Sequence, residues 1–191
     1  RYNICQISIL WTNSTDQAIY VAERSDGSNA ASLIAGLNEP HDIAVDATNK
    51  KLYFTDTVAG TIYSSDVDGS NRQAVLTELG DIYGIAVDPA GGKIYWTNSV
   101  GSIWSANLDN SSASAIITGL KNPHDIAIDT TAGKLYFTDL QDAIVYRSDL
   151  AGTNLEILHT ANLEDNVYGI AIAEITDNIP PGVSSIKRDD P

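Results

Sequence analysis

A four-residue aromatic motif recurs four times along the chain of 191 residues. Its copies begin at residues 10, 53, 95 and 136, so successive copies lie 43, 42 and 41 residues apart. They read LWTN at 10–13, YFTD at 53–56, YWTN at 95–98 and YFTD at 136–139. A nearly constant period of this length is typical of a chain built from one repeated supersecondary unit.

Each unit continues in the same order after its motif. A short strand comes first, followed by a turn rich in Gly, Asn and Asp, an apolar stretch and a final strand. The final strands are DIAVD at 42–46, GIAVD at 84–88, DIAID at 125–129 and GIAIA at 169–173. Four strands of about 4–6 residues per unit, with no helical period in any longer segment, predict one antiparallel blade.

The repeat therefore predicts an all-β fold, a β-propeller of four-stranded antiparallel blades. One blade cannot bury both of its faces, whereas stacked blades bury large side chains at about 1.5–3 kcal/mol each. Because the final strands of the units are almost continuously apolar, we expect them to be the innermost strands, covered on both faces. Turns such as DGSN at 26–29 and 68–71 are interpreted as tight connections.

The two ends of the repeat predict how the ring closes. The first unit has no inner strand ahead of ISILWTN, and the last inner strand, YGIAIA at 168–173, is followed by no further motif. We expect this C-terminal strand to complete the N-terminal blade, which removes an exposed sheet edge. The propeller then covers residues 1–182, and residues 183–191 form a C-terminal tail. A four-bladed monomer is favoured, with an eight-bladed homodimer as the alternative.

The motifs YWTN and YFTD, the latter followed by IYSSDVDGSNRQAVL in the second unit, resemble a known family. They are similar to the YWTD β-propeller repeats, or class B repeats, of the low-density-lipoprotein receptor family. The resemblance spans roughly residues 7–182. Propellers of that family usually have six blades and are often followed by a Cys-rich module, whereas this sequence has four units and one cysteine. The resemblance implies a protein partner held on the propeller face.

The residues before the inner strands alternate between two spellings. PHDIAVD at 40–46 and PHDIAID at 123–129 agree, and the other two units have Tyr-Gly in the place of His-Asp. A duplicated pair of blades explains this alternation and predicts a pseudo-two-fold axis. These side chains either cover the end of the channel, with Asp capping a turn, or line a ligand site. The candidate ligand-binding residues are His41, Asp42, Tyr83, His124, Asp125 and Tyr168.

Catalytic signatures are weak in this sequence. It has no nucleophile elbow, no phosphate-binding loop and no His-x-x-x-His pair, so we expect no catalytic residue and no cofactor. PHDIAVD also resembles the inner strands of lactonase and lyase propellers that hold a metal in the channel. A metal-dependent enzyme is therefore an alternative, with a channel-bound cation held by His41 and His124. His159 has no counterpart in the other units and is expected on the surface.

The formal net charge of the chain is −14, and its acidic residues are spread singly along the units. Nucleic acids and anionic membranes require basic surface, so neither is an expected partner. No apolar run approaches the ~18 residues of a membrane helix. Cys5 is the only cysteine, which leaves it either buried or linked to another chain. The chain contains no Met, so we expect a processed product or a fragment.

These observations favour a secreted, non-enzymatic binding protein that holds a protein or a carbohydrate on its propeller face. A carbohydrate-binding lectin is the second hypothesis, because several weak sites in one ring gain from multivalency. Asn13 and Asn110 begin Asn-x-Ser/Thr sequons. Each would carry a glycan on a surface turn if the chain is secreted by a eukaryote.

Overall fold

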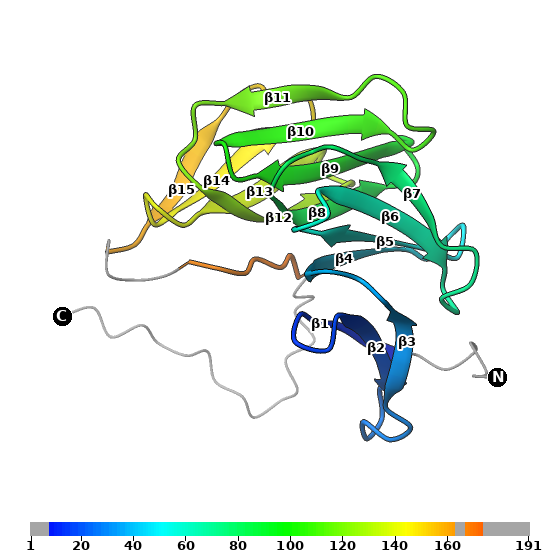
Figure 1. The fold of residues 1–191 in the computed structure, drawn as a ribbon. Coiled ribbons are helices and arrows are strands. Elements are labelled where there is room, and N and C mark those ends of the chain that lie inside the picture. The colour runs from blue at the N-terminus through cyan, green and yellow to red at the C-terminus, as the bar shows by residue number, and fades with distance from the viewer. Residues whose placement is uncertain (1–7, 163–166, 174–191) are drawn as a thin grey trace.

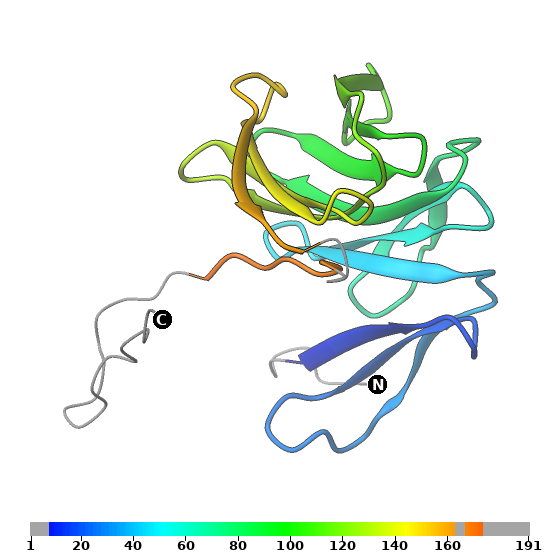
Figure 2. The same cartoon turned by 90° about the vertical axis from the view of Figure 1, so that its left-hand side faces the viewer.

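The computed structural model describes residues 8–162 and 167–173, which contain β-strands and turns. Four antiparallel sheets follow one another around a central axis, as Figures 1 and 2 show. The all-β prediction and the predicted four units are confirmed. Within the described ranges, no helix is long and apolar enough to cross a membrane.

Each sheet is built from strands that are consecutive in the chain. The first sheet contains β1 (Ser8–Asn13), β2 (Ala18–Glu23) and β3 (Ala31–Ala35). The second contains β4 (Pro40–Asp46), β5 (Lys51–Asp56), β6 (Thr61–Asp66) and β7 (Gln73–Leu76). The third contains β8 (Ile82–Asp88), β9 (Lys93–Asn98), β10 (Ser102–Asn107) and β11 (Ser114–Thr118). The fourth contains β12 (Pro123–Asp129), β13 (Lys134–Asp139), β14 (Ile144–Asp149) and β15 (Glu156–Thr160).

The turns between the second and third strands of each unit are confirmed as tight connections. In the first three units the Asp of the turn accepts a backbone N–H group, as in the bond from Ser70 N to Asp68 Oδ1 at 3.0 Å. The last residue of each turn has a left-handed backbone, which Asn tolerates better than most residues. These residues are Asn29, Asn71 and Asn154, and Ser112 in the third unit.

The aromatic residue of each motif stacks on an aromatic residue of the next strand. The two side chains are cross-strand partners in the ladder, and their ring centroids lie 5.3–6.0 Å apart. Such pairs contribute roughly 0.5–1.5 kcal/mol beyond area burial. The pairs are Trp11–Tyr20, Phe54–Tyr63, Trp96–Trp104 and Phe137–Tyr146.

Three hydrophobic cores lie between successive sheets in the described part of the chain. The core between the first and second sheets joins Ile34 to Leu52 and Phe54. The next joins Val75 to Trp96, and the last joins Ile117 to Phe137. The outer strand of one sheet therefore packs on the motif strand of the following sheet, as stacked propeller blades require.

The inner strands are less uniformly buried than their sequences predict. β8 is buried at every position except Tyr83, whereas β4 and β12 are only partly buried. The reason is their place in the row, because β8 lies between β4 and β12 while each of those has a full inner strand on one side only. The prediction that all inner strands are covered on both faces is wrong for β4 and β12.

The predicted closure of the ring is not present in the described residues. β1 pairs only with β2, so the first sheet has three strands. Residues 167–173 contain the predicted inner strand but have no regular secondary structure. In both views this segment, drawn in orange, runs between the fourth sheet and the first (Figures 1 and 2). The proposed C-terminal tail lies outside the described residues.

Candidate functional site

An irregularity at the start of each inner strand places the alternating residues at the axis. The ladder between β4 and β5 shifts register between Pro40 and Ile43, and equivalent shifts occur in the third and fourth sheets. Residues inside such a shift leave the regular ladder and can be re-aimed. The residues released in this way are His41-Asp42, Tyr83-Gly84 and His124-Asp125.

The threonine of each motif connects these irregular segments from one sheet to the next. Thr55 Oγ1 accepts a hydrogen bond from Asp42 N at 3.0 Å and donates one to the Tyr83 carbonyl at 2.7 Å. Thr97 does the same between Gly84 N and the His124 carbonyl, at 2.9 and 2.8 Å. This hydroxyl satisfies two backbone groups that the register shift would otherwise leave unpaired. Sequence reasoning identified the motif but missed this role of its threonine.

The two aspartates of the His-Asp pairs bridge adjacent inner strands. Asp42 accepts Ile43 N at 2.7 Å through Oδ1 and Ile85 N at 2.8 Å through Oδ2. Asp125 repeats this arrangement with Ile126 N at 2.8 Å and Ile170 N at 2.7 Å. Both oxygens of each carboxylate therefore accept backbone N–H groups. The sequence suggested that Asp caps one turn, whereas in the structure each Asp joins two separate backbone segments.

Gly84 replaces an aspartate for a steric reason. A Cβ atom at this position would lie 2.8 Å from the Asp125 Cα atom and 2.8 Å from the His124 carbonyl oxygen. The third sheet therefore approaches the fourth more closely than a side chain allows. The alternation of His-Asp with Tyr-Gly thus reflects two kinds of contact between sheets. The carboxylate of Asp42 bridges the second and third sheets, and Gly84 allows the backbones of the third and fourth sheets to approach directly.

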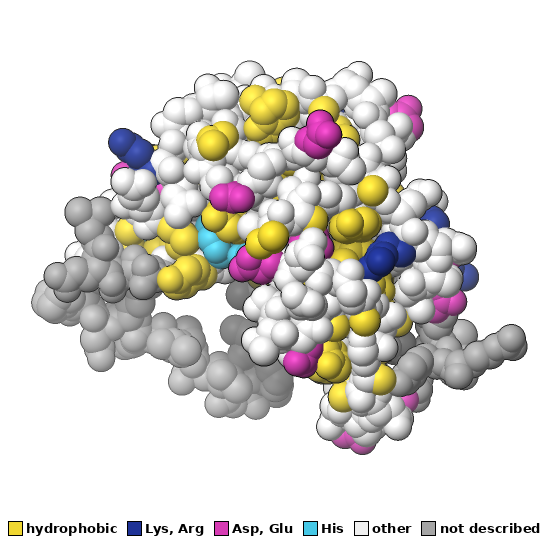
Figure 3. All heavy atoms as spheres, viewed as in Figure 1, with side chains coloured by type: hydrophobic (Ala, Val, Ile, Leu, Met, Phe, Trp, Pro, Cys, Tyr) yellow, Lys and Arg dark blue, Asp and Glu magenta, His cyan; other side chains and the backbone are white. Residues whose placement is uncertain are grey.

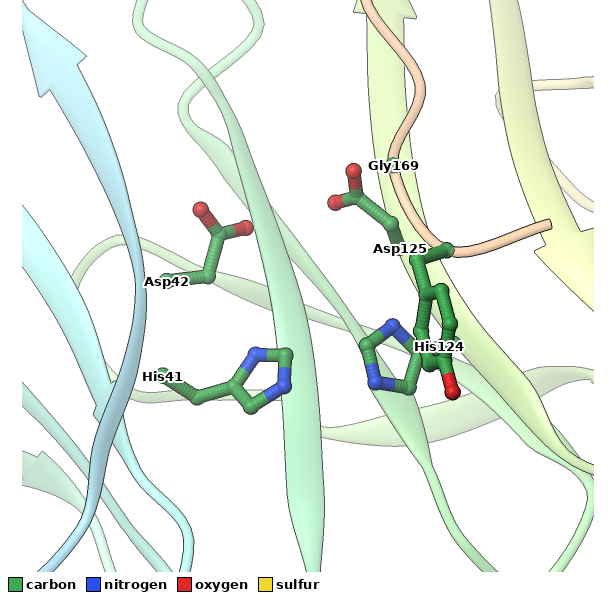
Figure 4. Close-up of a pocket in the computed structure, with 6 residues that line it drawn as sticks. His41, Asp42, His124, Asp125 and Gly169 are labelled. Atoms are coloured by element: carbon green, nitrogen blue, oxygen red, sulfur yellow. The ribbon is translucent and has the colours of Figure 1, made fainter. Parts of the chain in front are cut away.

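The His and Tyr side chains of the site form one aromatic cluster around the axis. The rings of His41 and His124 meet edge to face, with centroids 4.7 Å apart. Tyr83 lies 5.2 Å from His41 and 5.1 Å from His124, and Tyr168 lies 5.4 Å from His124. Figure 4 shows His41 and His124 pointing toward one another. The predicted pseudo-two-fold pairing of the two histidines is thus a direct ring contact.

Burial sets the protonation of the histidines. Burial and, to a smaller extent, the neighbouring His124 lower the pKa of His41 to about 4. Burial also lowers the pKa of His124, against a hydrogen bond with the Tyr168 backbone. Both imidazoles are therefore neutral at pH 7. In the described part of the chain, the Nδ1 atom of each is buried without a hydrogen-bond partner.

The pKa of Asp42 is shifted in the opposite direction, upward. The pKa of Asp42 is raised to about 7, chiefly by burial and also by the charge of Asp125, although the backbone hydrogen bonds from Ile85 and Ile43 act against the rise. Burial and a neighbouring negative charge both disfavour the charged form of Asp42. A proton or another positive group near Asp42 is therefore favoured.

Two adjoining hollows lie beside the cluster. One has a volume of about 180 Å³ and is lined by His41, Asp42, His124, Asp125, Tyr168 and Gly169. The other, of about 220 Å³, is lined by Leu10, Trp11, Thr12, His41, Asp42 and Ile43. In the space-filling view a histidine side chain is visible beside acidic and hydrophobic side chains (Figure 3). Within residues 8–162 and 167–173, no group of three or more potential metal ligands converges.

The structure brings together all six of the predicted ligand-binding residues. The other named residues lie elsewhere. Asn13 is engaged locally, with Nδ2 donating to Asp16 at 2.7 Å, whereas Asn110 is exposed in its turn. His159 is exposed on β15, as predicted. Cys5 lies outside the described residues.

The last residue of the motif was not among the predicted site residues. Asp56 accepts Asn38 N at 2.8 Å and Glu39 N at 2.9 Å, which fixes the loop that leads to His41. Asp139 does the same for Lys121 N and Asn122 N before His124. In the third sheet Asn98 donates to the Leu79 carbonyl instead. The alternation of Asp and Asn at the last position of the motif could have indicated this difference in hydrogen bonding.

Solved structures support the propeller fold. The structure of a nidogen/laminin complex matches with a TM-score of 0.78 and 21% identity over 85% of this chain and 63% of that chain. A TolB-like protein from Agrobacterium tumefaciens matches with a TM-score of 0.67 and 21% identity over 80% of this chain and 60% of that one. The hydrazine synthase of Kuenenia stuttgartiensis matches at 0.64 and 14% identity, over 80% and 46%.

This chain thus spans less than two thirds of the length of each of these structures. No family model and no curated protein sequence matches it. At these identities the likeness concerns the β-propeller fold alone.

Proposed function

We propose that this chain is a YWTD-type propeller that acts as a secreted, non-enzymatic binding protein and holds a protein partner on one face. That face is the one where the inner strands begin, and we call it the His face. It contains the six site residues and the loops that follow the motif strands. The observation that carries the proposal is a set of exposed apolar side chains on this face, Val58, Val100 and Tyr168, which we call the rim residues.

The side chains of Val58 and Val100 make no hydrogen bond and are largely exposed, whereas Tyr168 also packs on His124. Val58 and Val100 occupy equivalent positions, each two residues after the end of its motif, and each is largely exposed. Large exposed apolar side chains on a strongly acidic chain are more useful in a protein contact than in solution. Valine side chains donate and accept no hydrogen bonds, so they favour a protein surface over a sugar.

The central carboxylates support binding rather than catalysis. Both oxygens of Asp42 and of Asp125 hold backbone N–H groups of adjacent strands. A general base or a metal ligand at either position would have to share oxygens that already connect the sheets. The proposal therefore includes no catalytic residue and no cofactor.

Two further parts of the proposal concern the ring and the location. We propose that the ring is completed by pairing of residues 167–173 with β1. We also propose secretion, with a glycan on Asn110, whose turn is exposed. An intact mass equal to that of the bare polypeptide after expression in a eukaryotic secretory system would argue against the glycan.

The binding proposal is tested on an array of purified extracellular protein domains and, in parallel, on a glycan array. The wild-type chain is compared with Val58→Asp/Val100→Asp, whose side chains are exposed and whose fold should be kept. We expect a protein signal that the double variant loses at least tenfold. A matched control, Thr48→Asp/Ala90→Asp, places the same charges on exposed loops at the other ends of the inner strands.

The outcomes separate the hypotheses. Equal loss in both double variants would mean that charge, and not the His face, decides binding. A signal on glycans alone, or agglutination of red cells blocked by a simple sugar, would replace the protein partner with the lectin hypothesis.

A further inference from the structure

The hollow at the axis of the His face contains two carboxylates. Its volume is about 180 Å³. Neither Lys nor Arg is among the described residues that line it, which are His41, Asp42, His124, Asp125, Tyr168 and Gly169. Figure 4 shows both carboxylates on the same side of the two imidazole rings. Because burial keeps both imidazoles neutral at pH 7, the carboxylates set the sign of the charge in this hollow.

Further acidic side chains lie near the hollow. The pKa of the Tyr83 phenol is raised chiefly by burial, and the charges of Asp81 and Glu39 add to the rise, which places both carboxylates near this ring. Glu39 and Asp81 are exposed in the loops before β4 and β8, and the loop before β12 contributes Lys121. A group that approaches along the axis therefore meets a mainly negative field, which favours a cation.

Aromatic rings form the other part of the site. Tyr83 and Tyr168 lie on either side of His124, with ring centroids 5.1 and 5.4 Å from its own. The face of a tyrosine ring attracts a cation placed within about 6 Å of its centroid. In the described part of the chain, neither histidine has a hydrogen-bond partner at Nδ1. Because buried polar atoms without partners are rare, a cation that also donates hydrogen bonds suits this site.

The carboxylates favour a compact cation over a planar one. Each oxygen of Asp42 and of Asp125 already accepts one backbone N–H group. Neither carboxylate therefore offers a free pair of oxygens to the fork of a guanidinium. Each oxygen has a second lone pair, and an ammonium group can donate to a single one. A metal ion is disfavoured because no group of three potential ligands converges within residues 8–162 and 167–173.

We infer that the hollow at the axis receives the ammonium group of a lysine side chain presented by the protein partner. This inference rests on the proposed function and names the chemistry that the partner brings to the centre of the His face. The rim residues would contact apolar side chains around that lysine. Since a water molecule occupies about 30 Å³ in the liquid, a hollow of about 180 Å³ has room for one unbranched side chain and not for a folded element.

The histidine rings report on this binding directly. The chain has three histidines, of which His41 and His124 line the hollow and His159 is exposed on β15. The probe is Nα-acetyl-lysine methylamide, added to protein with isotope-labelled histidine at pH 8, above the pKa of Asp42. We expect saturable changes in the NMR signals of His41 and His124 and none in those of His159. His159→Gln identifies the signals of the reference ring.

Two further probes separate lysine from other groups. The arginine counterpart has the same charge on a planar group and should bind about tenfold more weakly. The lysine probe acetylated at Nζ has no charge and should leave the histidine signals unchanged. Equal changes with all three probes would show contact without recognition of an ammonium, and tighter binding of the arginine probe would assign the hollow to a guanidinium. Either result overturns the inference.

The outer carboxylates provide a matched pair of variants that leave the hollow itself unchanged. Glu39→Gln/Asp81→Asn removes two exposed charges beside Tyr83, and we expect the lysine probe to bind several-fold more weakly. Asp68→Asn/Asp109→Asn removes two charges from the exposed turns after β6 and β10, at the other end of the sheets, and should leave the affinity unchanged. Equal weakening in both variants would assign the effect to net charge and contradict a site at the axis.

Competition connects the probe with the partner. Excess lysine probe should displace the extracellular domain that gives the strongest array signal, and the arginine probe should displace it less. Changes at His41 and His124 without displacement would show that the partner does not use the hollow, and no changes at all would show that the hollow takes no ammonium group. Both results overturn the inference while the array signal remains. An absent array signal with intact changes at the histidines would instead remove the proposed function and keep the ammonium site.

Discussion

The first and third sheets contain almost the same motif but differ in what covers it. LWTN and YWTN both place a tryptophan on a strand, and both tryptophans stack on a cross-strand aromatic partner, at 5.5 Å for Trp11 and 6.0 Å for Trp96. The stacked pair is therefore a property of the two-strand ladder itself. Burial of the tryptophan is not, because Trp96 is covered by its inner strand and by the core between sheets, whereas Trp11 has neither among residues 8–162 and 167–173.

This comparison shows that the sequence of one repeat is sufficient to form the ladder of a blade. Assembly of the blades into a ring depends in addition on the neighbouring sheets. A propeller blade gains most of its stability from stacking, as in other repeat proteins. The first sheet, with one neighbour and three strands, is thus the part of the molecule whose stability depends most on residues 167–173.

The largest expected effect comes from deleting residues 167–191. If the segment completes the first sheet, its loss exposes Trp11 and leaves Asp125 and Thr138 without their partners. Two isoleucines at about 1.5–3 kcal/mol each and two hydrogen bonds at about 1 kcal/mol each amount to roughly 5 kcal/mol or more. That is comparable with the whole stability of many domains, so we expect aggregation or unfolding in size-exclusion chromatography and thermal melting.

The matched control for this deletion removes only residues 174–191. We expect that shorter deletion to leave the folded monomer in place. A chain lacking residues 167–191 that stays monomeric and melts at the wild-type temperature would mean that the first sheet is stable with three strands.

The next effect compares two glycines at equivalent positions. Gly84→Ala would place a Cβ atom 2.8 Å from the Asp125 Cα atom, and backbone cannot move aside easily. We expect a loss of about 3 kcal/mol, at the upper end of overpacking costs. At Gly169 the nearest atom is Asp125 Oδ2 at 3.7 Å, an ordinary contact, so Gly169→Ala should cost well under about 1 kcal/mol. Urea unfolding of the two variants measures the difference, and equal costs would contradict the close approach of the third and fourth sheets.

Threonine-to-valine substitutions sharpen the comparison between the first and third sheets. Thr97→Val removes a buried hydroxyl that serves Gly84 N and the His124 carbonyl, and we expect a cost of about 2 kcal/mol. Thr12→Val removes the one bond to the His41 carbonyl that the structure contains, so it should cost about 1 kcal/mol. Chemical denaturation of both variants is the measurement. A Thr12→Val cost as large as that of Thr97→Val would support a second bond from Gly169 N in solution.

Much of the fold was predictable because the sequence pattern of one blade recurs four times. The strands, the turns with Asn in a left-handed backbone and the six residues at the axis all follow from aligned units. The bridging by Asp42 and the two contacts of Thr55 were not predictable, because they depend on a register shift that brings residues 28 and 43 positions apart together. The uneven burial of β4 and β12 was missed for a related reason, since sequence shows an apolar strand but not how many neighbours it has.

The pH dependence of stability compares Asp42 with its neighbour His41. The pKa of Asp42 is raised to about 7, so the folded state holds a proton that the unfolded state releases, and this contribution falls as pH rises from about 4 to 7. The pKa of His41 is lowered to about 4, so the unfolded state holds the extra proton, and this contribution rises with pH between about 4 and 6.5. The two trends oppose one another in the wild type.

Substituting one residue of this pair should leave the pH dependence of stability that comes from the other residue. Relative to the wild type, Asp42→Asn should become more stable as pH rises from 4.5 to 6.5, and His41→Gln should become less stable from 4.5 to 7. Melting temperatures across this range measure both differences, on the order of a few degrees. Parallel profiles for both variants and the wild type would show that neither group titrates as its surroundings indicate.

The smallest expected effect concerns His159, which interrupts a series of apolar residues. The outer-strand residues Ile34, Leu76 and Ile117 pair with Ile19, Ile62 and Ile103 beside the register shift, and they pack toward the next sheet. His159 pairs with Val145 at the same place in the fourth sheet, where it is exposed. If the first sheet packs against the fourth in solution, His159→Ile extends the fourth core and should stabilise the chain by about 1 kcal/mol. If the two sheets stay apart, the side chain remains in water and the change should be within about 0.5 kcal/mol of zero. Urea unfolding of the variant and the wild type separates these outcomes.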